Sequence, residues 1–134
     1  LTPHPLEFSR LSGEGVEEVQ LHRMEKAADY AKKTGTTLVL KGAGTVVTDG
    51  NACYLNVTGS SALAKAGSGD VLAGLLAALT AQGVRATDAA ALAVYCHGLA
   101  ADTLAREFST FGVTPSDLPK QIGREIARLQ KENM

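Results

Sequence analysis

The sequence predicts an α/β fold, and three observations lead to that prediction. Apolar residues recur with the period of an α-helix over residues 16–33. A short apolar run bounded by glycine follows at residues 36–40, as expected of a strand buried on both faces. Residues 45–56 then form two β-prone segments around an Asp-Gly turn, and most of the remaining chain has helical patterns.

The elements before the glycine-rich loop follow from local signals. Thr2–Pro5 is expected to be extended, because a residue that precedes proline is disfavoured in the helical region. The first helix is expected to run without interruption over Val16–Lys33, with Gly35 ending it. The hairpin strands are expected at Thr45–Thr48 and Ala52–Asn56.

Three helices are expected after the loop. The first, Asp70–Gln82, is rich in Ala and Leu and is expected to be mostly buried, with Gly83 closing it. The second begins at a Thr87-Asp88 cap and runs to about residue 108. The third follows Thr114–Asp117, a capping pattern with proline at the first helical position.

The composition does not indicate a particular function, but it argues against some classes of partner and site. The 134 residues are 45% hydrophobic and 20% charged, which is ordinary for one globular domain or part of one. A net charge of −1 gives no argument for a nucleic-acid or membrane partner. Cys53 and Cys96 form no CxxC and are expected to be free thiols of a cytoplasmic protein. No His, Cys or acidic cluster has metal-ligand spacing, so no protein metal site is expected.

The loop Ala66-Gly67-Ser68-Gly69, followed by Asp70 and an apolar helix, is the most informative segment. Small residues leave backbone N–H groups accessible, and the helix N-terminus favours an anion. A carboxylate beside such a loop can take the proton of a hydroxyl during phosphoryl transfer. The residues alone leave a second interpretation open, in which the loop is an ordinary turn and Asp70 an N-cap.

Three motifs together resemble one family. They are Asn56-Val-Thr-Gly59 leading to Gly67-Ser-Gly-Asp70, Leu38–Gly50, and Leu1-Thr-Pro-His-Pro-Leu-Glu7. The first resembles the ribokinase-like superfamily, and the set resembles the ADP/ATP-dependent NAD(P)H-hydrate dehydratases. The resemblance implies a three-layer α/β/α fold of which residues 1–134 are the C-terminal half, with the N-terminal half absent from this chain. Three strands and four helices would leave a sheet edge exposed, which agrees with that expectation.

The resemblance also implies a role for each motif. It implies that Asp70 is the catalytic base and contacts the substrate, and that His4 contacts the substrate. It implies an anion hole and an adenine-nucleotide site made of the following residues: Gly67, Ser68 and Gly69 for the anion hole; Lys41, Gly42, Ala43, Gly44, Thr45 and Gly69 for the nucleotide. The sequence departs from the family pattern at Leu6, where glycine is expected, which weakens the assignment of a role to Glu7.

Several polar residues near these motifs stay open. Asn56 and Thr58 either support a magnesium-nucleotide site or turn the chain out of the hairpin. Lys65 could screen phosphate charge, although a solvated surface lysine is the favoured interpretation. His22 and His97 are expected to be structural.

The family's reaction is the repair of hydrated NADH or NADPH. ADP or ATP with Mg²⁺ phosphorylates the added hydroxyl, and phosphate then leaves to restore the nicotinamide double bond. We therefore expect an enzyme of this type, forming a homo-oligomer. Two alternatives remain: a ribokinase-like kinase for a sugar or vitamin precursor, and a non-catalytic fragment that needs a partner chain.

Overall fold

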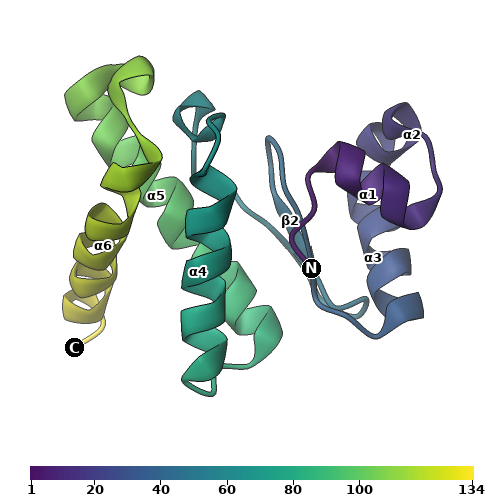
Figure 1. Cartoon of the computed structure of the whole chain (residues 1–134). Coiled ribbons are helices and arrows are strands. Elements are labelled where there is room, and N and C mark those ends of the chain that lie inside the picture. The colour runs from purple at the N-terminus through teal and green to yellow at the C-terminus, as the bar shows by residue number, and fades with distance from the viewer. The chain divides into compact units, whose positions relative to one another are not determined.

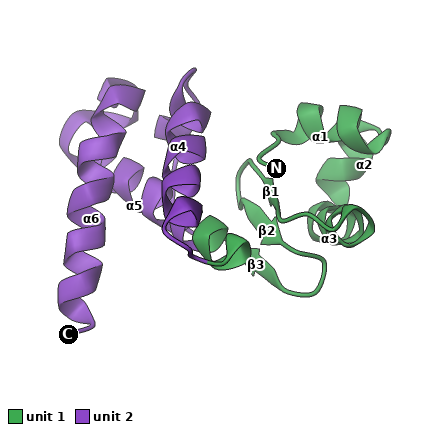
Figure 2. Cartoon of the chain, turned by 60° about the horizontal axis from the view of Figure 1, so that its bottom comes forward, with its two compact units in different colours: residues 1–56, 85–91 green, residues 57–84, 92–134 purple.

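The computed structural model describes residues 1–134 as six α-helices, two short 3₁₀ helices and three β-strands (Figure 1). The helices are α1 (Pro5–Ser12), α2 (Val16–Leu21), α3 (Arg23–Thr34), η1 (Ser61–Leu63), α4 (Ser68–Ala81), α5 (Ala86–Gly112), η2 (Pro115–Asp117) and α6 (Leu118–Glu132). The chain divides into two compact units (Figure 2): residues 1–56 with 85–91, called unit 1, and residues 57–84 with 92–134, called unit 2. None of the helices is both long enough and apolar enough to cross a bilayer.

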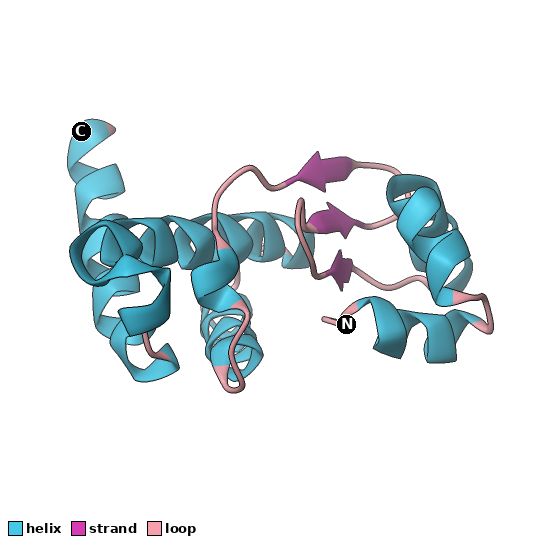
Figure 3. Cartoon of the chain, turned by 90° about the horizontal axis from the view of Figure 1, so that it is seen from above, coloured by secondary structure: helices cyan, strands magenta, loops and turns pink.

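Unit 1 contains the predicted strand and hairpin. The strands β1 (Leu38–Leu40), β2 (Val46–Thr48) and β3 (Cys53–Leu55) lie side by side in that order, and both pairings are antiparallel (Figure 3). All residues of β1 and β2 are buried, whereas Cys53 and Leu55 of the edge strand are exposed. The α/β class is confirmed, with strands shorter than predicted.

The N-terminal residues extend the sheet. The Val39 amide donates to the Leu1 carbonyl at 2.8 Å, and the Lys41 amide donates to the Pro3 carbonyl at 2.9 Å. The first three residues are therefore extended, as the prolines predicted, and they run along β1. Pro5, which was also expected to be extended, begins a helix instead.

Helix α1, which directly follows this extended segment, was not predicted. It begins at Pro5, and its N-cap is His4, whose Nδ1 accepts a hydrogen bond from the Glu7 amide at 3.1 Å. The Glu7 carboxylate accepts the His4 amide at 2.8 Å in return, which completes a capping box. Proline at N1 and glutamate at N3 were available signals. They were missed because histidine is not among the preferred N-cap residues.

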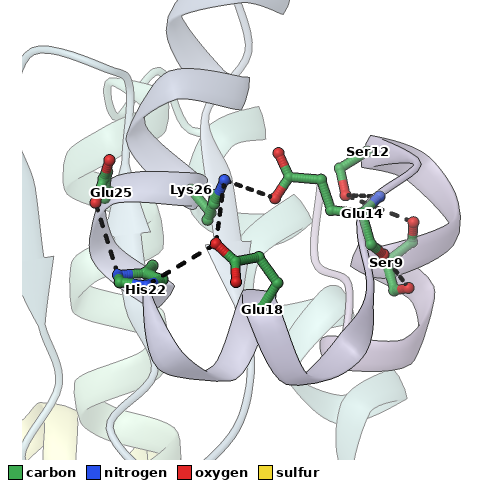
Figure 4. A network of polar contacts seen from close by, with 7 residues as sticks. All are labelled: Ser9, Ser12, Glu14, Glu18, His22, Glu25 and Lys26. Carbon is green, nitrogen blue, oxygen red and sulfur yellow. Dashed lines mark hydrogen bonds and ion pairs between the residues drawn. The ribbon is translucent and has the colours of Figure 1, made fainter.

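The predicted helix over residues 16–33 is wrong in one respect, because it breaks at His22. The backbone of His22 has φ −130° and ψ 44°, which separates α2 from α3. A polar network spans the break (Figure 4): His22 lies 3.9 Å from Glu18 and 3.8 Å from Glu25, and the Lys26 ammonium lies 3.2 Å from Glu14 and 3.8 Å from Glu18. The hydrogen bond with Glu14 is the main reason that the pKa of Lys26 lies above its ordinary value.

The hairpin turn requires glycine at position 50. Gly50 has φ +91°, and a Cβ there would lie 2.6 Å from the Cβ of Lys32, so the turn packs closely on α3. The Asp49 carboxylate accepts the Asn51 amide at 2.9 Å and the Ala52 amide at 2.8 Å. It also accepts the Thr87 hydroxyl at 3.2 Å, which connects the turn to the first turn of α5.

Unit 2 is helical, and two of its elements differ from prediction. Helix α4 starts at Ser68, two residues early, and only Ser68 and Leu72 in it are buried, although it was expected to be mostly buried. Helix α5 starts at Ala86, so the predicted Thr87-Asp88 cap instead lies within its first turn. Its regular backbone is interrupted at Ser109, where φ is +60°.

The remaining capping prediction is confirmed. Thr114 is the N-cap of η2 and forms a capping box with Asp117, after which α6 begins at Leu118. The core of unit 2 consists of small and aliphatic side chains, namely Ala62, Cys96, Ala100, Ala101, Leu104, Val113, Leu118 and Ile122.

The Asp49 turn predicts a pH-dependent contribution to stability. The Ala52 and Asn51 amides hold the pKa of Asp49 below its ordinary value of 3.8. Because the folded pKa is the lower one, the stabilisation is present above the unfolded pKa and is lost as the pH falls through the folded pKa. We expect Asp49→Asn to lower the urea midpoint at pH 7 and the difference from wild type to shrink toward pH 3. A difference that does not change with pH would contradict this account.

Candidate active site

The glycine loop of unit 2 presents unpaired backbone donors. Gly67 is the N-cap of α4 and has φ +96°, a conformation that favours glycine. The amides of Gly67, Gly69 and Asp70 donate to no acceptor within the chain. Unpaired N–H groups at a helix N-terminus, together with the helix dipole, favour an anion. The loop therefore offers an anion three donors that no other part of the chain uses.

Asp70 lies at the third position of α4, and its side chain is exposed. Because Gly67 occupies the N-cap position, the interpretation of Asp70 as an ordinary N-cap is wrong. The Asp70 carboxylate makes no hydrogen bond or ion pair with another residue of the chain. An exposed carboxylate with no structural partner is available to accept a proton from a hydroxyl.

Ser68 differs from its neighbours in the predicted anion hole. Its amide donates to the Lys65 carbonyl at 3.1 Å, so this N–H is already occupied by a turn within the loop. Its carbonyl lies 3.0 Å from Nε2 of the buried His97, and a neutral His97 must carry its proton on Nε2 to donate there. Ser68 thus anchors the loop to α5, and its membership of the anion hole stays a prediction, because its amide is bonded within the turn.

Lys65 is a second anchor of the loop. Its ammonium donates to the Thr110 carbonyl at 2.9 Å and to the Phe111 carbonyl at 3.0 Å, and it also contacts the Val113 carbonyl. These carbonyls belong to the C-terminal end of α5 and to the segment between α5 and η2. They follow Ser109, where the backbone of α5 departs from helical geometry. The interpretation of Lys65 as a solvated surface lysine is therefore wrong.

The Asn-x-Thr-Gly motif is held along one side of α5. The Thr58 hydroxyl donates to the Tyr95 carbonyl at 2.9 Å, and the Gly59 amide donates to the Asp102 carboxylate at 2.9 Å. Between these two contacts, a Cβ at Gly98 would lie 2.2 Å from Oγ1 of Thr58. The two backbones can approach this closely only because residue 98 is glycine. This geometry favours the interpretation in which Thr58 turns the chain.

Asn56, the first residue of that motif, ends unit 1. Its side chain is buried, and its Oδ1 accepts a hydrogen bond from the Tyr54 hydroxyl at 3.1 Å. Its amide donates to the Thr45 carbonyl at 2.9 Å. Asn56 therefore closes the end of the hairpin.

The Lys41–Thr45 loop follows β1 in unit 1. Gly42 and Gly44 have φ +139° and +67°, so the turn uses conformations that favour glycine. The Thr45 hydroxyl donates to the Gly42 carbonyl at 3.1 Å, which closes the loop. The Lys41 side chain is half-buried and has no hydrogen-bond or ion-pair partner in the chain. Its charge is available to an anionic ligand.

The structure places the Pro-His-Pro segment beside this loop. The Pro3 carbonyl accepts a hydrogen bond from the Lys41 amide. The pKa of Glu7 is lowered mainly by the hydrogen bond from the His4 amide, and the positive charge of Lys41 lowers it further. His4 is exposed and serves as the N-cap of α1. Leu6, which stands where glycine was expected, lies within regular helix and needs no special backbone conformation.

One cation near the loop was not predicted from the sequence. Arg23, the first residue of α3, donates to main-chain carbonyls of Leu40, Lys41 and Gly44. No motif marks it, because a charged residue in an amphipathic helix is typical of a solvated face.

Comparisons with known proteins define first the class and then the family. The fold matches part of a ribokinase-like protein from Enterococcus faecalis, with a TM-score of 0.78 and 30% identity over 95% of this chain and 43% of that one. The family model for NAD(P)H-hydrate dehydratase matches residues 1–124. The chain belongs to the NAD(P)H-hydrate dehydratase family.

Individual relatives agree with this family. A bifunctional NAD(P)H-hydrate repair enzyme of Moorella thermoacetica is 42% identical over 134 residues, covering 98% of this chain and 25% of the relative. An ADP/ATP-dependent NAD(P)H-hydrate dehydratase of Bacillus subtilis, crystallised with ATP and Mg²⁺, has a TM-score of 0.90 and 38% identity over 96% of this chain. The chain spans 47% of that structure and about a quarter of the bifunctional relative.

The Gly98 contact predicts a large effect from a small substitution. In the protein at its full encoded length, we expect Gly98→Ala to lower the free energy of unfolding by about 2–3 kcal/mol, because the added methyl group would overlap Thr58. The measurement is the urea midpoint.

Gly123→Ala is the matched control, since Gly123 is also in a helix but has nothing within 4 Å of the point where the added methyl group would lie. Here we expect a gain of about 0.5–1 kcal/mol from helix propensity. Equal effects at the two positions would show that the close approach of α5 to Thr58 is not important.

Proposed function

We propose that this chain supplies the phosphoryl-transfer part of an ADP/ATP-dependent NAD(P)H-hydrate dehydratase. The observation that carries the proposal is the set of unpaired Gly67, Gly69 and Asp70 amides beside the partnerless Asp70 carboxylate. Family membership supports it, since relatives of this name include one crystallised with ATP and Mg²⁺. The substrate class is hydrated NADH or NADPH.

The reaction has two steps. The Asp70 carboxylate takes the proton of the added hydroxyl as its oxygen attacks the terminal phosphorus of ATP or ADP, and ADP or AMP leaves with the electron pair of the broken P–O bond. The Gly67, Gly69 and Asp70 amides stabilise negative charge on the transferred group. The carbon–oxygen bond to phosphate then breaks, a proton leaves the neighbouring carbon, and the double bond of the nicotinamide ring is restored.

We assign the adenine nucleotide to the Lys41–Thr45 loop and to Gly69. The available Lys41 ammonium supports this assignment, because a cation with no internal partner can pair with phosphate. We assign His4 to the hydrated nicotinamide nucleotide. The exposure of its side chain at the start of α1 supports this role.

Magnesium fits this site as part of the nucleotide. The chain has no group of three or more His, Cys, Asp or Glu side chains that could hold a metal ion. Mg²⁺ commonly keeps several waters and binds through substrate phosphates with one or two carboxylates. When bound, it neutralises charge on the phosphates, and Asp70 is the carboxylate nearest to the proposed anion site in sequence.

We also propose that residues 1–134 are the C-terminal part of one ribokinase-like domain. The share of the Bacillus subtilis structure that the chain covers supports this, as does the exposure of the apolar helix α4. Further chain, or copies of the protein in a homo-oligomer, would cover such a surface. A cytoplasmic location is supported by the two free cysteines.

The activity is tested by incubating the protein at its full encoded length with hydrated NADH and either ADP or ATP. We expect absorbance at the reduced-nicotinamide wavelength to recover and inorganic phosphate to be released. A stable phosphorylated product without recovery would favour the small-molecule kinase instead. The absence of both phosphoryl transfer and nucleotide binding would contradict the proposal.

Asp70→Asn tests the assignment of the base. We expect kcat to fall by about 10²–10⁴-fold, because the amide cannot accept the hydroxyl proton, while the unfolding temperature stays near that of wild type. Asp29→Asn is the control, since Asp29 is also exposed in a helix but lies outside both loops. Wild-type kcat in the Asp70 variant would exclude a role for this carboxylate in proton transfer.

A further inference from the structure

We propose that Arg23 is a positioning residue that sets the conformation of the Lys41–Thr45 loop for nucleotide binding. The inference rests on the proposed function only in naming the nucleotide as the ligand of this loop. The hydrogen bonds that carry it lie within unit 1.

The guanidinium of Arg23 satisfies the acceptors of the loop. Its Nη2 lies 3.1 Å from the Leu40 carbonyl, 3.3 Å from the Lys41 carbonyl and 3.2 Å from the Gly44 carbonyl. Its Nη1 donates to Oε1 of Gln20 at 2.9 Å, which fixes the plane of the guanidinium. One side chain thus connects the end of β1 to both sides of the turn.

The other backbone hydrogen bonds of the loop lie at its two ends, from the Lys41 amide to the Pro3 carbonyl and from the Asn56 amide to the Thr45 carbonyl. Gly42 and Gly44 both have positive φ values, and glycine is the residue that gains most conformational freedom when a loop loosens. A Cβ at Gly42 would lie 3.1 Å from both terminal nitrogens of Arg23, so the backbone passes directly over the guanidinium. The Thr45 hydroxyl contact to the Gly42 carbonyl closes only the far side.

The charge of Arg23 is also not neutralised by an acid. No carboxylate lies in ion-pair distance of Arg23, in contrast to Arg85, which pairs with Asp88 at 2.9 Å. Partial burial lowers the pKa of the Arg23 guanidinium, but arginine remains charged at neutral pH. Carbonyl dipoles alone face this charge, so it adds a positive potential behind the loop that favours a bound polyphosphate.

A lysine at position 23 could not make all the hydrogen bonds that Arg23 makes. Arginine offers several donors in a planar fork, whereas lysine is a single charge on a flexible stem. Arg23→Lys therefore keeps the charge and loses most of the carbonyl contacts, and Arg23→Met loses both. Comparing the two variants separates the electrostatic effect from the geometric one.

The first measurement is hydrogen–deuterium exchange of residues 41–46 in the ligand-free protein at its full encoded length. We expect exchange in this segment to be at least about tenfold faster in Arg23→Met, because the carbonyl contacts that order the loop are lost. Arg85→Met, which removes an exposed arginine of the same unit, is the matched control and should leave the segment unchanged. Exchange as slow as in wild type would overturn the positioning role.

The second measurement is steady-state kinetics of the same variants with ADP or ATP. We expect Arg23→Met to raise the KM for the nucleotide by about tenfold or more, with Arg23→Lys intermediate and with KM for hydrated NADH changed less than threefold. Equal increases in both KM values, accompanied by a lower unfolding temperature, would show a merely structural role and overturn the inference. If wild type and Arg85→Met neither bind nor turn over the nucleotide while exchange responds as expected, the proposed function fails and the positioning of the loop stands.

Discussion

The close packing of α5 against the Thr58–Gly59 backbone is the constraint on which the arrangement of unit 2 depends. Glycine at position 98 permits that approach, and two hydrogen bonds, one on each side of it, hold the motif in register with the helix. One residue earlier on α5, His97 donates to the Ser68 carbonyl at the start of α4. A single helix therefore holds both the segment that leads into the glycine loop and the helix that follows it.

This arrangement explains which backbone donors remain free. The Ser68 amide and carbonyl and the Lys65 ammonium are all used to fasten the loop to its surroundings. The neighbouring Gly67 and Gly69 amides lie at the N-terminus of α4, where the helix offers them no acceptor, and they remain unpaired. An anion site needs donors that do not reorganise when charge develops, and anchoring at Ser68 and Lys65 supplies that rigidity.

The second loop follows the same physical logic with different residues. Arg23 binds the carbonyl oxygens of the Lys41–Thr45 turn, and the Lys41 ammonium has no hydrogen-bond or ion-pair partner in the chain. The break at His22 makes Arg23 the first residue of a new helix. In both loops, a cation of the chain binds backbone carbonyls and thereby stabilises a glycine-rich turn. The Lys41 ammonium in one loop and backbone amides in the other have no hydrogen-bond partner in the chain.

The sequence predicted the elements whose signals are local. Asp-Gly between β-prone segments predicted the hairpin, and Thr114 with Asp117 predicted the last cap. It did not predict the break at His22, because the residues there include neither proline nor glycine and the apolar spacing continues through it. Helix α1 was missed because an unusual N-cap residue, His4, begins it.

The candidate site, too, could be predicted from the sequence only in part. The small residues of the loop and Asp70 were evident from composition and spacing, whereas the occupied Ser68 amide depends on a turn that spacing does not reveal. Arg23 and Lys65 were not identified as anchors, because their partners are backbone carbonyls distant in sequence. A pattern of side-chain types carries no information about such partners.

The most direct test of the account is a crystal structure of the protein at its full encoded length with Mg²⁺ and a non-hydrolysable ATP analogue. We predict terminal phosphate oxygens within hydrogen-bonding distance of the Gly67, Gly69 and Asp70 amides, with the Ser68 amide still bonded to the Lys65 carbonyl. A terminal phosphate bound away from all three amides would contradict the account.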